Sequence, residues 1–270
     1  MTEPTASTTI RRSILAAGPA AWIRRGGFFV GLMVLWELLA RSQLWPSYLF
    51  PSPTGVLESL AQGFRDGTFF IGIRGSLGRL VEGYLISMVV GLTLGLLMAQ
   101  LRWVKDTLGL AVMGMQALPS ICWLPLALLW FGLSPTAILF VVVMGSVLSI
   151  AQATEDGVRN TPPIYLRAAQ TLGARGWQLY PNVILPSALP SILTGMKLGW
   201  SFAWRSLMAG ELLYTLPGLG ALLTMGRELN DMSRVVAVML VIIAIGLLAD
   251  QVLFGQAERR VRERWGLLAR

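Results

Sequence analysis

Long apolar runs recur along this chain, separated by segments that hold most of the charged and turn-forming residues. A helix needs about 20 such residues to cross a hydrocarbon core of roughly 30 Å. The runs do not alternate between apolar and polar positions, which is the pattern of a barrel strand. We therefore predict an all-α, polytopic integral membrane protein with six transmembrane helices. These are expected at residues 27–45, 76–100, 106–131, 136–154, 190–213 and 234–254.

The six spans define a transmembrane domain over residues 27–254, between an N-terminal tail, 1–26, and a C-terminal tail, 255–270. Arg11-Arg12 and the short apolar stretch after it are faintly similar to a twin-arginine export signal. Pro19 interrupts that stretch and Arg24-Arg25 ends it. We expect an uncleaved, disordered start that leads into a short basic surface helix.

Composition agrees with a membrane protein, because only 13% of the residues are charged and 54% are apolar. A soluble domain carries about 25% charged residues. The net charge of +8 is interpreted as a sign of topology and of contact with anionic lipid, not with nucleic acid. With no His and one Cys, Cys122, the chain has no internal disulfide, and we expect no metal site and no cofactor.

The first two spans and the segment between them carry residues that predict local structure. Glu37 and Arg41 are four apart and are expected to pair on one helix face, and Arg79 and Glu82, three apart, are expected to do the same. Between these spans, the stretch that begins at Ser52 predicts a short amphipathic helix.

The third and fifth spans hold the candidates for a translocation pathway. Pro119 and Pro125, with Trp123 between them, predict a bent helix, which is either a simple kink or a pathway lining. Lys197 and Arg205 lie on nearly the same face of the fifth span. Lys197, near a span end, fits a paired or snorkelling residue. Arg205, near mid-span, is expected to face a pathway or a subunit interface.

Small residues form faces on the second and fifth spans, where helices can approach one another closely. Such faces fit packing within the chain, which we favour, or a seam between two copies. They consist of Gly91, Gly95, Gly199, Ala203 and Gly210.

The basic residues predict the orientation, because loops on the cytoplasmic side are enriched in Lys and Arg. If both termini are cytoplasmic, the inside segments hold 14 of the 22 basic residues. This topology also places the longest internal polar segment, residues 155–188, in the cytoplasm.

That segment, 155–188, is a polar, helix-forming stretch set between two spans. Pro162-Pro163 provides a rigid start, Gly173 a clean helix end, and Trp177 an aromatic surface. From the pattern alone, the segment fits either a helix that docks on a partner and moves with it, or an amphipathic helix lying on lipid.

The spacing within this segment resembles the EAA loop of ABC importer permeases, in which the loop is the helix that couples the permease to its ATPase. The leading Glu of the family pattern is Arg167 here, and the usual Ile is Val183. The resemblance implies that the coupling residues are Arg167, Ala168, Ala169, Gly173, Ala174, Val183, Leu185 and Pro186.

Nearly the whole chain from about residue 28 to 265 resembles the nitrate/sulfonate/taurine branch of these permeases. Further matching segments include Phe50-Pro-Ser-Pro53, Ser76-Leu-Gly-Arg79, the run from Trp123 to Gly132 and Pro217-Gly-Leu-Gly220. The resemblance implies a type I ABC importer permease of a bacterial inner membrane. It also implies a second permease copy, two ATP-binding subunits and an external solute-binding protein.

The chain contains no GxxxxGK[ST] phosphate-binding loop, so we expect ATP hydrolysis to occur in a separate subunit and no enzymatic activity here. The basic residues of the fifth span weakly favour an anionic solute. Two other classes remain open: an integral membrane enzyme or assembly factor that uses the loop for another partner, and a secondary transporter that works without an ATPase.

Overall fold

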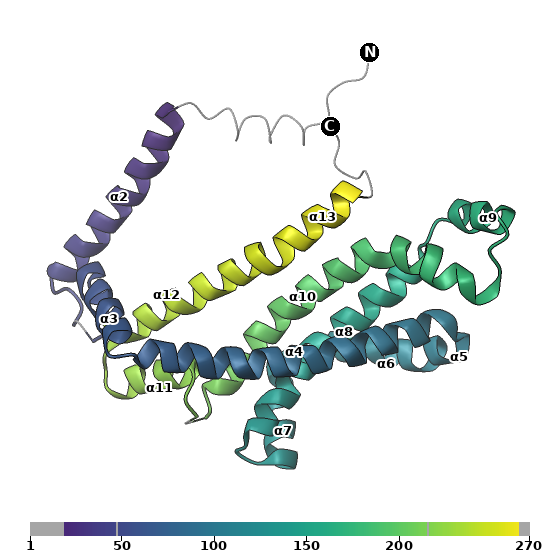
Figure 1. The fold of residues 1–270 in the computed structure, drawn as a ribbon. Coiled ribbons are helices and arrows are strands. Elements are labelled where there is room, and N and C mark those ends of the chain that lie inside the picture. Colours follow the sequence, from purple (N-terminus) through teal and green to yellow (C-terminus); the bar gives the residue numbers. More distant parts are fainter. Residues whose placement is uncertain (1–18, 47, 215, 265–270) are drawn as a thin grey trace.

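In the computed structural model, residues 19–46, 48–214 and 216–264 are described, and the regular secondary structure of this part of the chain is helical, without a strand. Figure 1 shows long helices lying side by side, with shorter helices at both ends. The helices are α2 (Pro19–Arg41), α3 (Pro53–Arg65), α4 (Thr68–Gln100), α5 (Arg102–Val104), α6 (Leu110–Gln116), α7 (Leu124–Phe131), α8 (Pro135–Arg159), α9 (Pro163–Thr171), α10 (Leu185–Glu211), α11 (Leu219–Glu228), α12 (Met232–Ala249) and α13 (Gln256–Arg264).

Five of the six predicted spans overlap long helices, although the spans 27–45 and 190–213 extend past the ends of α2 at Arg41 and of α10 at Glu211. Three of these, α4, α8 and the continuous helix Met232–Val261, are long and apolar enough to cross a membrane. The helices α2 and α10 have 23 and 27 residues, so they have the length, but they are less apolar on average than α4 and α8. The expected N-terminal tail differs from the structure in one respect, because α2 already begins at Pro19. Arg11-Arg12 and the expected disordered start lie outside the described residues.

The predicted span 106–131 is broken into two helical parts, Arg102–Gln116 and Ser120–Phe131, at an angle of 105°. Pro119 lies in the break, and a short 3-10 turn follows it. Pro125 lies in the first turn of α7, where a helix loses no internal hydrogen bond to proline. The expected bend is confirmed, and it separates α6 from α7 instead of merely curving one helix.

The centre of the molecule is α8, which lies between α4 and α10. Small residues recur every fourth position on the α4 face that meets α8, namely Gly83, Ser87, Gly91 and Gly95. A methyl group on Gly91 would lie 2.9 Å from the Ile150 side chain, so the two backbones approach more closely than any larger residue allows.

A buried hydrogen bond between the two helices reinforces this contact. Ser146 of α8 donates to the hydroxyl of Ser87 at 2.7 Å, and both side chains are fully buried. Ser87 donates to the carbonyl of Gly83, and the single hydroxyl proton of Ser146 is shared between Ser87 and the carbonyl of Val142, so both side chains are hydrogen-bonded.

A neighbouring face of α8, which shares Ile150 with the first, receives α10 through a second row of small residues. A methyl group on Gly199 would lie 2.8 Å from Ile150, and Ala203 is fully buried in the same contact. The small residues of the second and fifth spans are thus used for packing within the chain, as expected in preference to a dimer seam.

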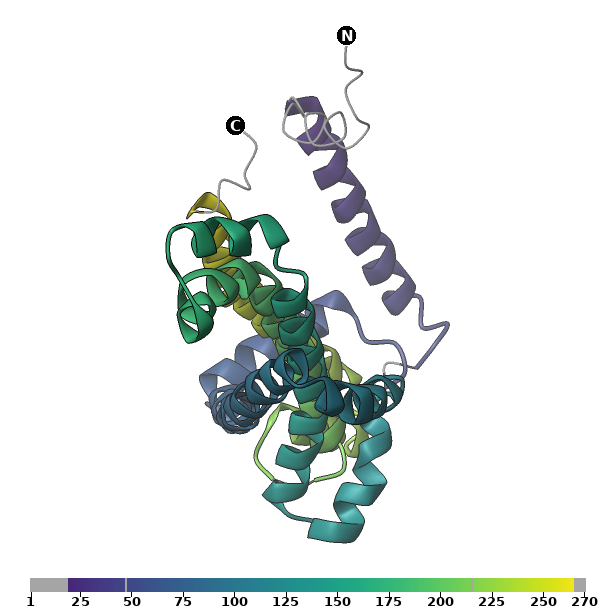
Figure 2. The same cartoon turned by 90° about the vertical axis from the view of Figure 1, so that its right-hand side faces the viewer.

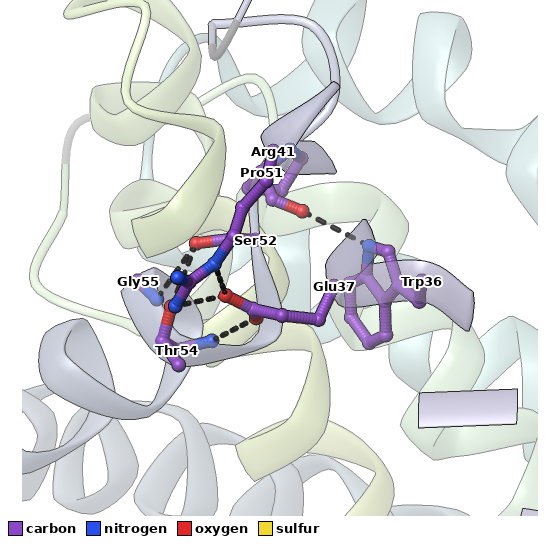
Figure 3. Close-up of polar contacts among 7 residues, drawn as sticks. All are labelled: Trp36, Glu37, Arg41, Pro51, Ser52, Thr54 and Gly55. Carbon is purple, nitrogen blue, oxygen red and sulfur yellow. Dashed lines mark hydrogen bonds and ion pairs between the residues drawn. The ribbon is translucent and has the colours of Figure 1, made fainter. Parts of the chain in front are cut away.

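Polar contacts join the end of α2 to the start of α3 (Figure 3). Glu37 pairs with Arg41 at 2.6 Å, as predicted, and it also accepts hydrogen bonds from the backbone N–H and hydroxyl of Thr54. Ser52 caps the same helix end, and Trp36 donates to the carbonyl of Pro51. A carboxylate at a helix N-terminus is favourable, because the free N–H groups there carry partial positive charge.

Apart from this junction, α2 stands away from α4, α8 and α10 in both views (Figures 1 and 2). Its apolar side chains are left exposed within the single chain, with Phe28 at 68% and Leu38 at 61%. Such a surface needs lipid or another protein chain to cover it.

The close packing of α4 on α8 generates a testable prediction. Gly91→Val should destabilise the protein by about 1–3 kcal/mol, because the added side chain overlaps Ile150 and the α8 backbone. Thermal unfolding of the detergent-purified chain measures the change. The matched control is Gly78→Val on the same helix, where nothing lies within 4 Å of an added Cβ. Equal stability of the two variants would contradict the packing described here.

Candidate functional site

The exposed loop between α8 and α10 is the first candidate site, and it lies at one end of the molecule (Figures 1 and 2). Its main element is α9, a nine-residue helix with no fully buried residue. Leu172 is 88% exposed, Trp177 75% and Ile164 68%. Three large apolar side chains on one polar loop are unfavourable in water, so this surface suits a partner or a lipid interface.

The end of α9 is closed by a Schellman motif, the common helix end in which glycine takes a left-handed conformation. Gly173 has φ of 92° and donates to Gln170, and the N–H of Ala174 donates to the carbonyl of Ala169. Nothing lies within 4 Å of an added Cβ at Gly173, so its outer face is open. The turn is therefore fixed by the backbone of this chain, while the space beside Gly173 is free for a partner.

After this turn the chain reaches α10 through a second compact segment. Gly176 also has a positive φ, of 53°, and the rings of Trp177 and Tyr180 stack with centroids 5.5 Å apart. A π-helical turn, Tyr180–Ile184, then leads directly into α10. The loop and α10 are consequently continuous in backbone structure.

The structure places all eight predicted coupling residues in this loop and the first turn of α10. Four are exposed: Arg167, Ala168, Gly173 and Leu185. The other four are half-buried: Ala169, Ala174, Val183 and Pro186. Arg167, which departs from the family pattern, forms no ion pair within the described residues.

A charged cluster lies where α8 leads into the loop. Glu155 accepts from Lys105 at 2.6 Å and from Arg159 at 3.0 Å. Lys105 belongs to the connection after α4, so the cluster ties that connection to the end of α8. Sequence reasoning identified Glu155 only as the end of a span and did not find this contact.

At the opposite end of the molecule, a buried carboxylate joins three helices. Glu211, at the end of α10, is 1% exposed and pairs with Arg79 of α4. Ser76, one turn before Arg79, donates to the same carboxylate at 2.7 Å. The predicted pairing of Arg79 with Glu82 is wrong. Arg79 faces α10, whereas Glu82 is exposed on another side of α4.

The same carboxylate also completes the start of α11. Gly220 donates its N–H to Glu211 at 3.0 Å, and Leu219 donates to the hydroxyl of Ser76 at 2.9 Å. The capping position itself is Gly218, which has no side chain to cap with. A Cβ on Gly218 would overlap Arg79 and Glu211, so the glycine makes room for a cap supplied by another helix. We call Ser76, Arg79, Glu211 and the segment 217–220 the outer clasp.

Tyr214 fixes the connection between α10 and the outer clasp from its other side. Its hydroxyl donates to the carbonyl of Gly132, in the turn between α7 and α8, at 3.1 Å. Burial raises the pKa of Tyr214, which favours the protonated hydroxyl that donates this bond. The connection is therefore attached to α4, α7 and α11 at once.

The second candidate site is a cavity of about 310 Å³ beside α10, at the break between α6 and α7. Of the predicted pathway residues, Arg205 and Pro119 line it. Lys197 lies elsewhere and pairs with Asp250 at 3.2 Å, in agreement with an internal pair. Trp123 packs against Phe140, and Pro125 is exposed at the start of α7. Within the described residues, no group of three acidic or Cys side chains is placed to hold a metal ion.

Residues 91–263, well over half of the chain, match the sequence profile of the family described as binding-protein-dependent transport system inner membrane component. The chain belongs to this family. It is a permease subunit of an ABC importer, and this class of transport system also contains ATP-binding subunits and a substrate-binding protein.

Individual relatives and a solved structure agree with this assignment. The permease is 31% identical to the taurine transport system permease protein TauC of Escherichia coli, over 83% of each chain. It is 27% identical to the bicarbonate transport system permease protein CmpB of Synechocystis, over 82% of each. A chain of the MetNI methionine ABC transporter superposes with a TM-score of 0.62 at 19% identity, over 72% of this permease and 96% of that chain. The last match confirms the predicted type I permease fold.

The outer clasp generates a prediction for stability. Glu211→Ala should lower the stability of the permease by about 3–5 kcal/mol, because it leaves Arg79 half-buried without its partner and uncaps α11. It should also expose the connection 212–218 to proteolysis. The control is Glu82→Ala on α4, which removes an exposed carboxylate. Thermal unfolding and limited proteolysis measure both effects, and similar behaviour of the two variants would exclude the clasp as a stabilising contact.

Proposed function

We propose that the loop between α8 and α10 docks on separate ATP-binding subunits and transmits their conformational change to this permease. The observation that carries the proposal is the shape of that loop: a short helix with a fixed turn and exposed apolar side chains. The residues that contact the ATPase are Arg167, Ala168, Ala169, Gly173, Ala174, Val183, Leu185 and Pro186. ATP hydrolysis itself occurs in the partner subunits.

The path from this loop to the cavity is continuous in backbone structure. The π-helical turn joins the loop to α10, and α10 packs along α8 through small residues. Arg205 lies on α10, 20 positions after Leu185, which corresponds to about 30 Å of helix. A movement of the loop therefore reaches the side chain that lines the cavity along one continuous helix, which contains Pro190 near its start.

In the membrane, we propose six crossings with both termini and the coupling loop in the cytoplasm. The excess of basic residues in the inside segments supports this orientation. Figure 1 is compatible with it, because α9 lies at one end of the molecule and α3 and α11 lie at the other. The outer clasp then faces the external side, where a solute-binding protein delivers its cargo.

We further propose a homodimer in the lipid bilayer, with the pathway between or beside the two copies. The single chain leaves α7 and the turn after it strongly exposed, with Leu129 at 80% and Leu133 at 76%. Together with α2, this apolar surface is available to lipid and to a second copy.

For the transported solute we propose a small anion. The cavity contains the guanidinium of Arg205, and the relatives include permeases for taurine and for bicarbonate. A transporter independent of an ATPase would use the same cavity. An ATP requirement for uptake into reconstituted vesicles distinguishes an ATPase-driven importer from a transporter that works without an ATPase.

The coupling loop gives the first prediction for transport. Gly173→Glu should abolish ATP-dependent uptake while leaving membrane insertion intact, because it adds a bulky charge where the partner must approach. Gly173→Asn is the matched control, since Asn tolerates the left-handed conformation at this turn. We expect this control to retain most of the uptake. Normal uptake by Gly173→Glu, at normal protein level, would rule out coupling through this loop.

The orientation gives a second prediction, tested by cysteine labelling of intact cells after Cys122→Ser. Leu229→Cys, after α11, should react with an impermeant maleimide from outside. Leu172→Cys, in the coupling loop, should react only after the membrane is opened. Both positions are well exposed, at 60% and 88%, so accessibility within the fold is not limiting. Labelling of Leu172→Cys in intact cells would disprove the topology.

A further inference from the structure

The cavity beside Arg205 is shaped by the break at Pro119 and by a glycine. The chain turns by 105° around Pro119, so residues 116–120 form one wall while α8 and α10 form the others. Gly145 of α8 faces this wall. A Cβ on Gly145 would lie 3.3 Å from the Cβ of Ser120 and would overlap Ser206. The absence of a side chain at Gly145 therefore lets α8 lie close to α10 and to the segment around Ser120.

One part of the lining is polar and offers hydrogen-bond donors. Arg205 is exposed in the single chain and contributes a permanent positive charge. Its guanidinium lies 5.5 Å from the centre of the Phe202 ring and forms no ion pair within the described residues. Ser120 and Ser149 add hydroxyl groups that make no hydrogen bond to other described residues. No Asp or Glu lines the cavity, so its charge is positive.

The other part of the lining is apolar. Leu118, Met144, Leu148 and Phe202 face the same space as Arg205 and the two serines. A cavity of about 310 Å³ is at the lower end of the range typical for sites that hold a small organic molecule. Such sites combine an apolar wall with a few polar groups that orient the ligand.

We propose that this cavity binds an organic monoanion, whose sulfonate or carboxylate group meets Arg205, Ser120 and Ser149 and whose apolar body packs on the remaining wall. The inference rests on the proposed function, because it names the class of solute that passes this site. Guanidinium and hydroxyl donors match the oxygens of both acid groups. An organic cation would meet Arg205 without any carboxylate to offset it.

The apolar wall separates this class from inorganic anions. Nitrate or bicarbonate would satisfy the donors but would leave Leu148 and Phe202 in contact with water. Each methylene group that moves from water to such a wall strengthens binding by about fourfold. A series of alkanesulfonates should therefore bind more tightly with each added carbon until the cavity is filled.

The test labels one cysteine at the cavity in membrane vesicles that contain the complete transporter. Ala117 lines the cavity, is exposed and contributes no donor, so Ala117→Cys in a Cys122→Ser background reports on access without removing a binding group. Two methanethiosulfonate reagents of similar size are compared, an anionic sulfonatoethyl and a cationic trimethylammonioethyl compound. Because both carry the same reactive group, their rate ratio measures the charge preference of the cavity.

We expect the anionic reagent to react at least about tenfold faster than the cationic one, as a positively lined cavity concentrates anions. Arg205→Met should reduce this ratio to within about twofold. The control Arg227→Met removes an exposed cation from α11, outside the cavity, and should leave the ratio unchanged.

Protection from labelling identifies the ligand class. Hexanesulfonate and hexanoate should protect, and the half-protecting concentration should fall about fourfold per carbon from butanesulfonate to hexanesulfonate. Nitrate, bicarbonate and hexyltrimethylammonium should protect poorly.

Protection by nitrate equal to that by hexanesulfonate would overturn the proposal. A charge preference that survives Arg205→Met would also overturn it, and so would a failure of both reagents to label Ala117→Cys. The labelling requires no ATP. It can therefore fail while coupling through Gly173 is intact, or succeed while coupling is absent.

Discussion

The fold depends on the close approach of α4 and α10 to the two faces of α8. Gly83, Gly91 and Gly95 on α4 and Gly199 on α10 bring backbones nearer than larger side chains permit. In a membrane, where lipid is as apolar as the helices, such contact supplies the packing that holds helices together. With α8 fixed in this way, the coupling loop and the Arg205 cavity have set positions, because both are built on the helices that surround it.

Much of this arrangement could be predicted from the sequence. The apolar runs identified the long helices, and Pro162, Gly173 and the spacing around them identified the helical loop between α8 and α10, for which we propose the coupling role. Pro119 indicated a bend but not its 105° angle, because that angle depends on how α6 and α7 pack against α8. The fifth-span glycines were correctly assigned to packing within the chain, since their spacing matches one helix face.

Contacts between residues distant in sequence could not be predicted in the same way. Arg79 has a carboxylate three residues away, yet it pairs with one 132 positions later. Local spacing favoured Glu82, and only the packing of α4 against α10 shows which face Arg79 occupies. The signal was present in Pro217-Gly-Leu-Gly220, where two glycines precede and open a helix without a capping side chain. The absence of a local cap implies that another part of the chain supplies it, but it does not reveal which helix.

The Schellman turn at Gly173 has a consequence for the proposed docking of the ATPase. The bonds from Gly173 to Gln170 and from Ala174 to Ala169 lie entirely within this chain, so α9 and its turn are formed before any ATPase is present. A segment that folds only on docking loses conformational entropy at that moment, and affinity falls accordingly. Here that loss occurs when the permease itself folds. In the proposed coupling role, the encounter with the ATPase is thus close to a rigid-body association, in which surface complementarity, and not induced folding, determines which ATPase is accepted.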